Sequence, residues 1–130
     1  MSEPNKVIPK HILLVDDDPD VRDTVKLFLQ LDEHTVTEAK NGREALEMFT
    51  PDCFDLVISD YTMPEMRGDE LAAKVKHLAP SQPILMLTGS AEMREGSGPQ
   101  VDAVLTKPFS IGDLRAAIAR SCSLAQLSPA

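Results

Sequence analysis

Short apolar runs alternate along the chain with longer segments in which apolar residues recur every three or four positions. Four apolar runs and one weaker alternating segment predict strands at 11–15, 35–39, 54–59, 83–87 and 101–106. The periodic segments predict amphipathic helices between the strands, one stopped by Pro51 and another by Pro80. This order is typical of a parallel sheet with helices on both faces.

Residues that favour helix N-termini precede three of the periodic segments, and these are Asp18, Asn41 and Ser110. The second and third are followed, three positions on, by a carboxylate that can complete a capping box. The segment 90–100 instead contains two glycines and a proline, which limit any helix there to about two turns. We therefore expect the fourth helix to be shortened or irregular.

Composition narrows the class of protein. The 130 residues are 42% hydrophobic and 26% charged, which is typical of one soluble domain. The net charge of −8 disfavours direct contact with nucleic acid. No apolar run approaches the roughly 20 residues of a membrane span, and 1–10 lacks the apolar core of a signal peptide, so we expect a cytoplasmic protein without membrane contact. The spacing of Cys53 and Cys122 supports neither a disulfide framework nor a zinc site.

Polar residues follow the predicted strands directly. In a parallel sheet the carboxyl ends of the strands meet at one edge, and ligands bind there. The residues expected at this edge are Asp16, Asp17, Asp60, Thr88 and Lys107. Three neighbouring carboxylates repel one another, and a divalent cation such as Mg²⁺ relieves that repulsion. With a lysine and a hydroxyl nearby, the set has the parts for moving a phosphoryl group onto a carboxylate.

At these positions the sequence resembles the receiver domains of response regulators, the chemotaxis-type receiver family of two-component systems. The resemblance is carried by ILLVDDDP at 12–19, DLVISDYTMPEMRG at 55–68, MLTGS at 86–90 and VLTKPF at 104–109. It implies an α/β fold, a flavodoxin-like, doubly wound, five-stranded parallel sheet of the (βα)5 type. Because the N-terminal residues are polar and include proline, we expect a flexible lead-in at 1–9, followed by the receiver domain at 10–122 and a short C-terminal tail at 123–130.

The resemblance assigns the metal ligands. Asp17 is expected to bind Mg²⁺, or Mn²⁺ in its place, directly, and Asp16 to do so directly or through water. Asp60 and the main-chain carbonyl of Thr62 would complete the ligands that the protein supplies. Asp60 would also be the phosphoacceptor.

The resemblance likewise implies how the phosphoryl group is received. Thr88 would bind a phosphoryl oxygen, and Lys107 would pair with the phosphoryl group or, before transfer, with Asp60. A cis peptide bond is expected before Pro108. The donor would be a phosphohistidine on a sensor histidine kinase or a histidine phosphotransfer protein, and the product would act on a downstream partner, with a phosphorylation-dependent dimer as one outcome. Such a domain is not an enzyme with turnover, since it catalyses only its own phosphorylation and slow autodephosphorylation.

Three features depart from the family pattern. Val104 stands where most receivers carry Tyr or Phe, Gly89 stands where Ala is frequent, and the segment 88–107 is short. A valine cannot swing inward as the aromatic ring does, so we hypothesise that the switch alters loop order in 88–100. Two alternatives stay open: a pseudo-receiver that binds partners without phosphorylation, and an aspartate-nucleophile phosphatase. Thr62 argues against the second, because such enzymes carry an additional acid beside the nucleophile.

Overall fold

The structure is a computed structural model of the 130-residue chain that describes residues 8–89 and 101–127. Its strands are β1 (His11–Val15), β2 (Thr35–Ala39), β3 (Leu56–Asp60), β4 (Ile84–Thr88) and β5 (Ala103–Thr106). Its helices are α1 (Pro19–Leu31), α2 (Gly42–Met48), α3 (Gly68–Leu78) and α5 (Ile111–Leu127). The predicted fourth helix falls within 90–100 and so lies outside the described residues.

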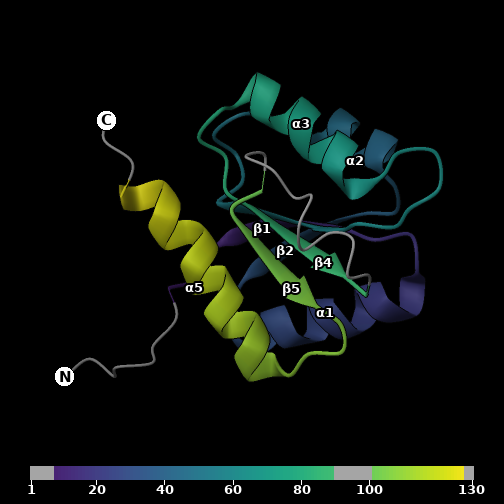
Figure 1. Ribbon diagram of the computed structural model, residues 1–130. Helices are drawn as coiled ribbons and strands as arrows, with labels where there is room; N and C mark the ends of the chain where they lie inside the picture. The colour runs from purple at the N-terminus through teal and green to yellow at the C-terminus, as the bar shows by residue number, and fades with distance from the viewer. Residues whose placement is uncertain (1–7, 90–100, 128–130) are drawn as a thin grey trace.

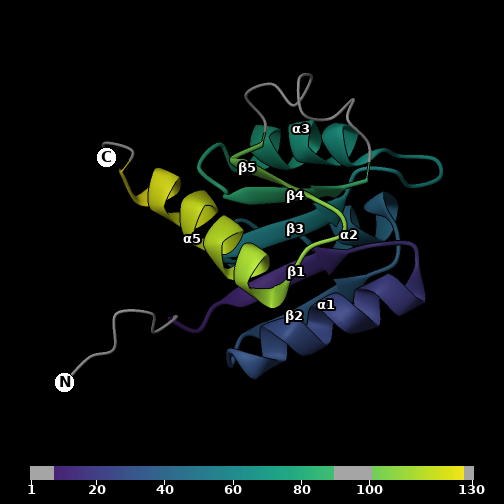
Figure 2. The same ribbon diagram turned by 60° about the horizontal axis from the view of Figure 1, so that its bottom comes forward.

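The strands form one five-stranded sheet in the order β2-β1-β3-β4-β5, and every neighbouring pair is parallel. Helices α1 and α5 cover one face of this sheet, and α2 and α3 cover the other (Figures 1 and 2). The predicted doubly wound, flavodoxin-like arrangement is therefore confirmed. All the carboxyl ends of the strands consequently meet at a single edge.

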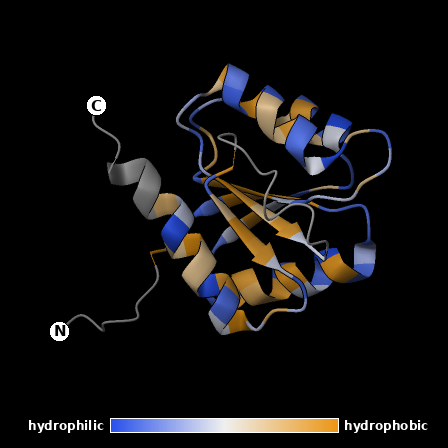
Figure 3. Ribbon diagram, in the orientation of Figure 1, coloured by the Kyte–Doolittle hydropathy of each residue, from blue (hydrophilic) through white to orange (hydrophobic). Residues whose placement is uncertain are grey.

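Buried apolar side chains line both faces of the sheet, and the front strands β4 and β5 are mostly orange in Figure 3. Side chains of a strand alternate between the faces, so Ile12 and Leu14 of β1 pack among residues of α1 and α5. Leu13 and Val15 pack on the other side, among residues of α2 and α3. Each fully buried aliphatic side chain of this kind contributes about 1.5–3 kcal/mol of hydrophobic stabilisation. The continuous apolar runs in the sequence reflect this burial on two sides.

The helix N-termini are capped largely as their sequences predict. The Asp18 carboxylate accepts hydrogen bonds from the main-chain N–H groups of Asp20 and Val21, at 2.9 and 3.4 Å. Ser110 and Asp113 form the predicted capping box, with each backbone N–H donating to the other side chain at 3.0 Å. At α2, Asn41 caps the helix as expected.

The Glu44 side chain differs from the expectation. It accepts from the backbone N–H of Lys40, at 2.9 Å, and so reaches one residue further back than a capping box requires.

Some element boundaries differ from the prediction. α5 continues to Leu127, past the boundary at 122 where we expected a tail to begin, because the leucines, alanine and glutamine that follow are strong helix formers. Leu78, near the C-terminus of α3, is 52% exposed. It closes the last turn of that helix and lines a surface pocket with Leu46 and His77.

Among the described residues, no helix has the length and apolarity needed to cross a membrane.

Candidate functional site

Three carboxylates meet at the carboxyl edge of the sheet. Asp60 is the last residue of β3, and Asp16 directly follows β1, the strand that pairs with β3. One carboxylate oxygen from each of Asp16, Asp17 and Asp60 lies within 4.8 Å of the others. Asp16 and Asp60 are buried, whereas Asp17 is exposed. The structure thus brings together the three acidic residues that the sequence predicted at this edge.

Lys107 supplies the positive charge opposite these carboxylates. It directly follows β5, and its Nζ donates a hydrogen bond of 2.8 Å to Oδ1 of Asp60. The same Nζ lies 3.9 Å from Oδ2 of Asp16. The backbone N–H of Lys107 donates to the carbonyl of Thr88 at 2.7 Å, which ties the residue to the end of β4. The Lys107–Pro108 peptide bond is cis, as the resemblance implies.

The two threonines occupy different environments. Thr88 ends β4 and is buried; it lies one residue beyond Leu87, the cross-strand neighbour of Asp60. Its hydroxyl therefore belongs to the same sheet edge as the carboxylates. Thr62 is exposed and lies two residues after Asp60, between β3 and α3. Its main-chain carbonyl stays a prediction as a metal ligand.

Burial makes the negative charge of these carboxylates unfavourable. Desolvation raises the pKa of Asp16 to about 6, and repulsion from Asp60 and Asp17 adds to this. The hydrogen bond from the Asp18 N–H and the charge of Lys107 act in the opposite direction. Burial also raises the pKa of Asp60, against the hydrogen bond and charge of Lys107. One ammonium group therefore compensates the carboxylates only in part.

One buried oxygen atom at this edge indicates a binding site for a cation. Oδ2 of Asp16 is buried and has no hydrogen-bond partner among the described residues. A buried anionic oxygen without a donor is costly, and a hard cation satisfies it. Carboxylate oxygens are the ligands that Mg²⁺ prefers, and Mg²⁺ is commonly held by one or two of them. The donor set at this edge of the sheet therefore fits Mg²⁺.

The sequence matches the response regulator receiver domain family over residues 12–119. The chain belongs to this family. Receiver domains of this family are part of two-component signalling, and the fold described above is theirs. The match covers the strands from the second residue of β1 onward and most of the described helical residues.

Individual relatives of this receiver domain differ in length. The transcriptional regulatory protein GlrR of Escherichia coli is 35% identical over 125 residues, which are 94% of this chain but 28% of GlrR. The receiver protein CpdR of Brucella abortus is 36% identical over 108 residues, 81% of this chain and 90% of CpdR. The chain thus spans about a quarter of the first relative and nearly all of the second.

Solved structures extend the comparison. The crystal structure of the response regulator TrrA from Thermotoga maritima, in complex with Mg²⁺–BeF, matches with a TM-score of 0.78 and 31% identity. The match covers 85% of this chain and 97% of that one. This chain and TrrA therefore share the receiver fold over most of this chain and nearly all of TrrA.

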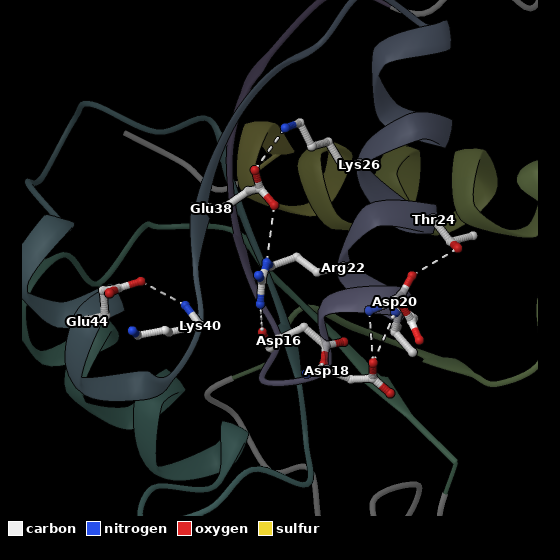
Figure 4. A network of polar contacts seen from close by, with 10 residues as sticks. Asp16, Asp18, Asp20, Arg22, Thr24, Lys26, Glu38, Lys40 and Glu44 are labelled. Atoms are coloured by element: carbon white, nitrogen blue, oxygen red, sulfur yellow. Dashed lines mark hydrogen bonds and ion pairs between the residues drawn. The ribbon is translucent and has the colours of Figure 1, made fainter.

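Sequence reasoning did not single out Arg22, which contacts the acidic turn of this receiver domain. Its Nη1 donates to the main-chain carbonyl of Asp16 at 2.7 Å, and its Nε donates to Glu38 at 3.1 Å (Figure 4). Arg22 lies on α1 and Glu38 on β2. The only signal in the sequence was a pair of opposite charges on a helix and the strand that follows it.

Proposed function

We propose that this receiver domain takes a phosphoryl group onto Asp60 in a Mg²⁺-dependent reaction. The donor would be the phosphohistidine of a sensor histidine kinase or of a histidine phosphotransfer protein. The observation that carries the proposal is the contact of Asp60 with Lys107, at 2.8 Å, beside two further carboxylates within 4.8 Å. A nucleophile, a cationic donor and a metal-binding group then surround one point.

The residues divide the chemistry between them. Lys107 holds one oxygen of Asp60, and the other oxygen attacks phosphorus while the bond from phosphorus to the donor nitrogen breaks. Lys107 and the Thr88 hydroxyl would donate hydrogen bonds to the oxygens of the arriving group.

Asp16, Asp17, Asp60 and the carbonyl of Thr62 would hold Mg²⁺. When bound, the ion neutralises charge on the phosphoryl oxygens.

The remaining functional assignments follow from this role. The domain acts as a phosphoacceptor, and its own catalysis is limited to its phosphorylation and slow autodephosphorylation. Its net charge of −8 favours protein partners over nucleic acid. We place it in the cytoplasm, with a partner protein or a phosphorylation-dependent dimer receiving the signal.

Incubation with Mg²⁺ and acetyl phosphate, followed by intact-mass measurement, tests the proposal. We expect one phosphoryl adduct on the wild type, none on Asp60→Asn, and none when EDTA removes the metal. The Asp60→Asn substitution keeps the size of the side chain while removing the anionic nucleophile, so it is the matched control. An adduct on Asp60→Asn would refute the assignment, and no adduct on the wild type would favour the pseudo-receiver alternative.

We expect Asp17→Ala to weaken Mg²⁺ binding by at least about a hundredfold, because it removes a direct ligand and not merely a supporting group. Isothermal titration calorimetry measures the dissociation constant. Asp20→Ala is the control, since it removes an equal charge from the exposed start of α1, outside the carboxylate cluster. Equal losses of affinity in the two variants would mean that general charge, and not ligation, attracts the ion.

A further inference from the structure

The guanidinium of Arg22 contacts the acidic turn after β1. Arg22 lies in the early part of α1, and its side chain is only 19% exposed. It donates from Nη1 to the carbonyl of Asp16 at 2.7 Å and from Nε to Oε1 of Glu38 at 3.1 Å. Figure 4 shows the side chain reaching across from the helix to both acceptors. Arg22 therefore connects the turn to strand β2.

Asp16 is fixed at nearly every polar atom. Its N–H donates to the carbonyl of Ala39 at 3.1 Å, and its Oδ1 accepts from the N–H of Asp18 at 2.9 Å. Its carbonyl accepts the hydrogen bond from Arg22. The oxygen left over is Oδ2, which is buried beside the other carboxylates. The three hydrogen bonds therefore determine where the oxygen that would face the metal lies.

Glu38, which accepts the second hydrogen bond of Arg22, is itself held in place. Glu38 accepts hydrogen bonds on both oxygens, from Arg22 on Oε1 and from Nζ of Lys26 on Oε2 at 2.9 Å. A guanidinium is planar and presents several donors in a fixed fork, so it can bridge two acceptors in a defined geometry. An ammonium group is a point donor on a flexible chain and cannot reproduce this bridge.

We propose that Arg22, anchored by Glu38, is a positioning residue of the metal site that holds the Asp16 turn in the geometry required for Mg²⁺. This inference rests on the proposed Mg²⁺-dependent function. Arg22 contacts the main chain of Asp16 and not the carboxylate, so it acts through the residue that it orients. Residues that orient metal ligands typically contribute about ten- to a hundredfold to metal affinity.

Electrostatics alone predicts the opposite result. Arg22 carries a positive charge close to a site for a cation, so its removal would tighten Mg²⁺ binding if only charge mattered. A positioning role predicts weaker binding when the residue is removed. The sign of the change therefore separates the two explanations.

The decisive comparison is between Arg22→Ala and Lys26→Ala. Both variants remove one positive charge from α1 and one hydrogen bond to Glu38, but only the first removes the contact with Asp16. We expect calorimetric titration with MgCl₂ to show binding about tenfold weaker in Arg22→Ala, and within about twofold of the wild type in Lys26→Ala. Circular dichroism selects a temperature at which each variant is folded.

Arg22→Lys serves as the second variant, because it keeps the charge and is less disruptive to folding. We expect it also to bind Mg²⁺ several-fold more weakly than the wild type, since one ammonium cannot bridge both acceptors. Wild-type affinity in Arg22→Lys or Arg22→Ala, or equal losses in Arg22→Ala and Lys26→Ala, would overturn the inference alone. A wild-type domain that does not bind Mg²⁺ would refute the proposed function, and the inference with it.

Discussion

Replacing Lys107 with methionine is expected to slow phosphorylation of Asp60 by about a hundred- to a thousandfold, the usual cost of losing one donor to a developing charge. The same substitution is expected to tighten Mg²⁺ binding, because the ammonium lies 2.8 Å from Asp60 and 3.9 Å from Asp16 and repels a second cation. Intact-mass measurement over time gives the phosphorylation rate, and calorimetry gives the affinity for Mg²⁺.

Lys76→Met is the matched control for this prediction. Lys76 is also a half-buried lysine paired with an aspartate, Asp102 at 3.0 Å, but it lies at the opposite edge of the sheet, where β4 begins. We expect this control to lose some stability and to keep its phosphorylation rate. If Lys107→Met unfolds the domain or leaves the rate unchanged, the role given to Lys107 is wrong.

Substituting Gly68 with alanine is expected to destabilise the domain by about 2–3 kcal/mol, as overpacking of a dense interior does. A Cβ at this position would lie 2.5 Å from the main-chain oxygen of Asp60 and 2.9 Å from Cα of Tyr61. Both atoms belong to the backbone that carries the phosphoacceptor, so relief of the contact would displace Asp60. Urea denaturation measures the free energy of unfolding, and the phosphorylation rate should fall as well.

Two other glycines provide comparisons for the loss of stability expected in Gly68→Ala. A Cβ at Gly42 would meet Sδ of Met66 at 2.7 Å, but this atom lies near the end of a flexible side chain that can move away. A Cβ at Gly89 would meet nothing within 4 Å. We expect the loss of stability to increase from Gly89→Ala through Gly42→Ala to Gly68→Ala. A Gly68→Ala domain as stable as Gly89→Ala would show that the backbone around Asp60 yields easily.

The positions of the site residues could be predicted because they follow from topology. Once the apolar runs are assigned to parallel strands, the residues after them must lie at one edge, whatever the details of packing. Asp16 directly follows β1, Asp60 ends β3 and Lys107 directly follows β5, and the three meet as this reasoning requires. Four short sequence stretches around these positions then identified the family.

Arg22 and Glu38 could not be found in this way. Their contact depends on how α1 packs against the edge strand β2, which hydrophobic periodicity does not specify. The end of α5 was missed for a related reason: the residues after 122 favour a helix but lack a clear core-facing pattern. Periodicity predicts which elements exist more reliably than where they end.

Every residue of the connection between β1 and α1 has a role. Between the end of β1 at Val15 and the start of α1 at Pro19 lie only Asp16, Asp17 and Asp18. The last of these caps the helix, and the first two turn toward Asp60. An inserted or deleted residue here would move either Asp18 out of the capping position or Asp16 and Asp17 away from Asp60. We therefore expect this connection to be fixed in length, whereas loops at the opposite edge of the sheet can vary in length.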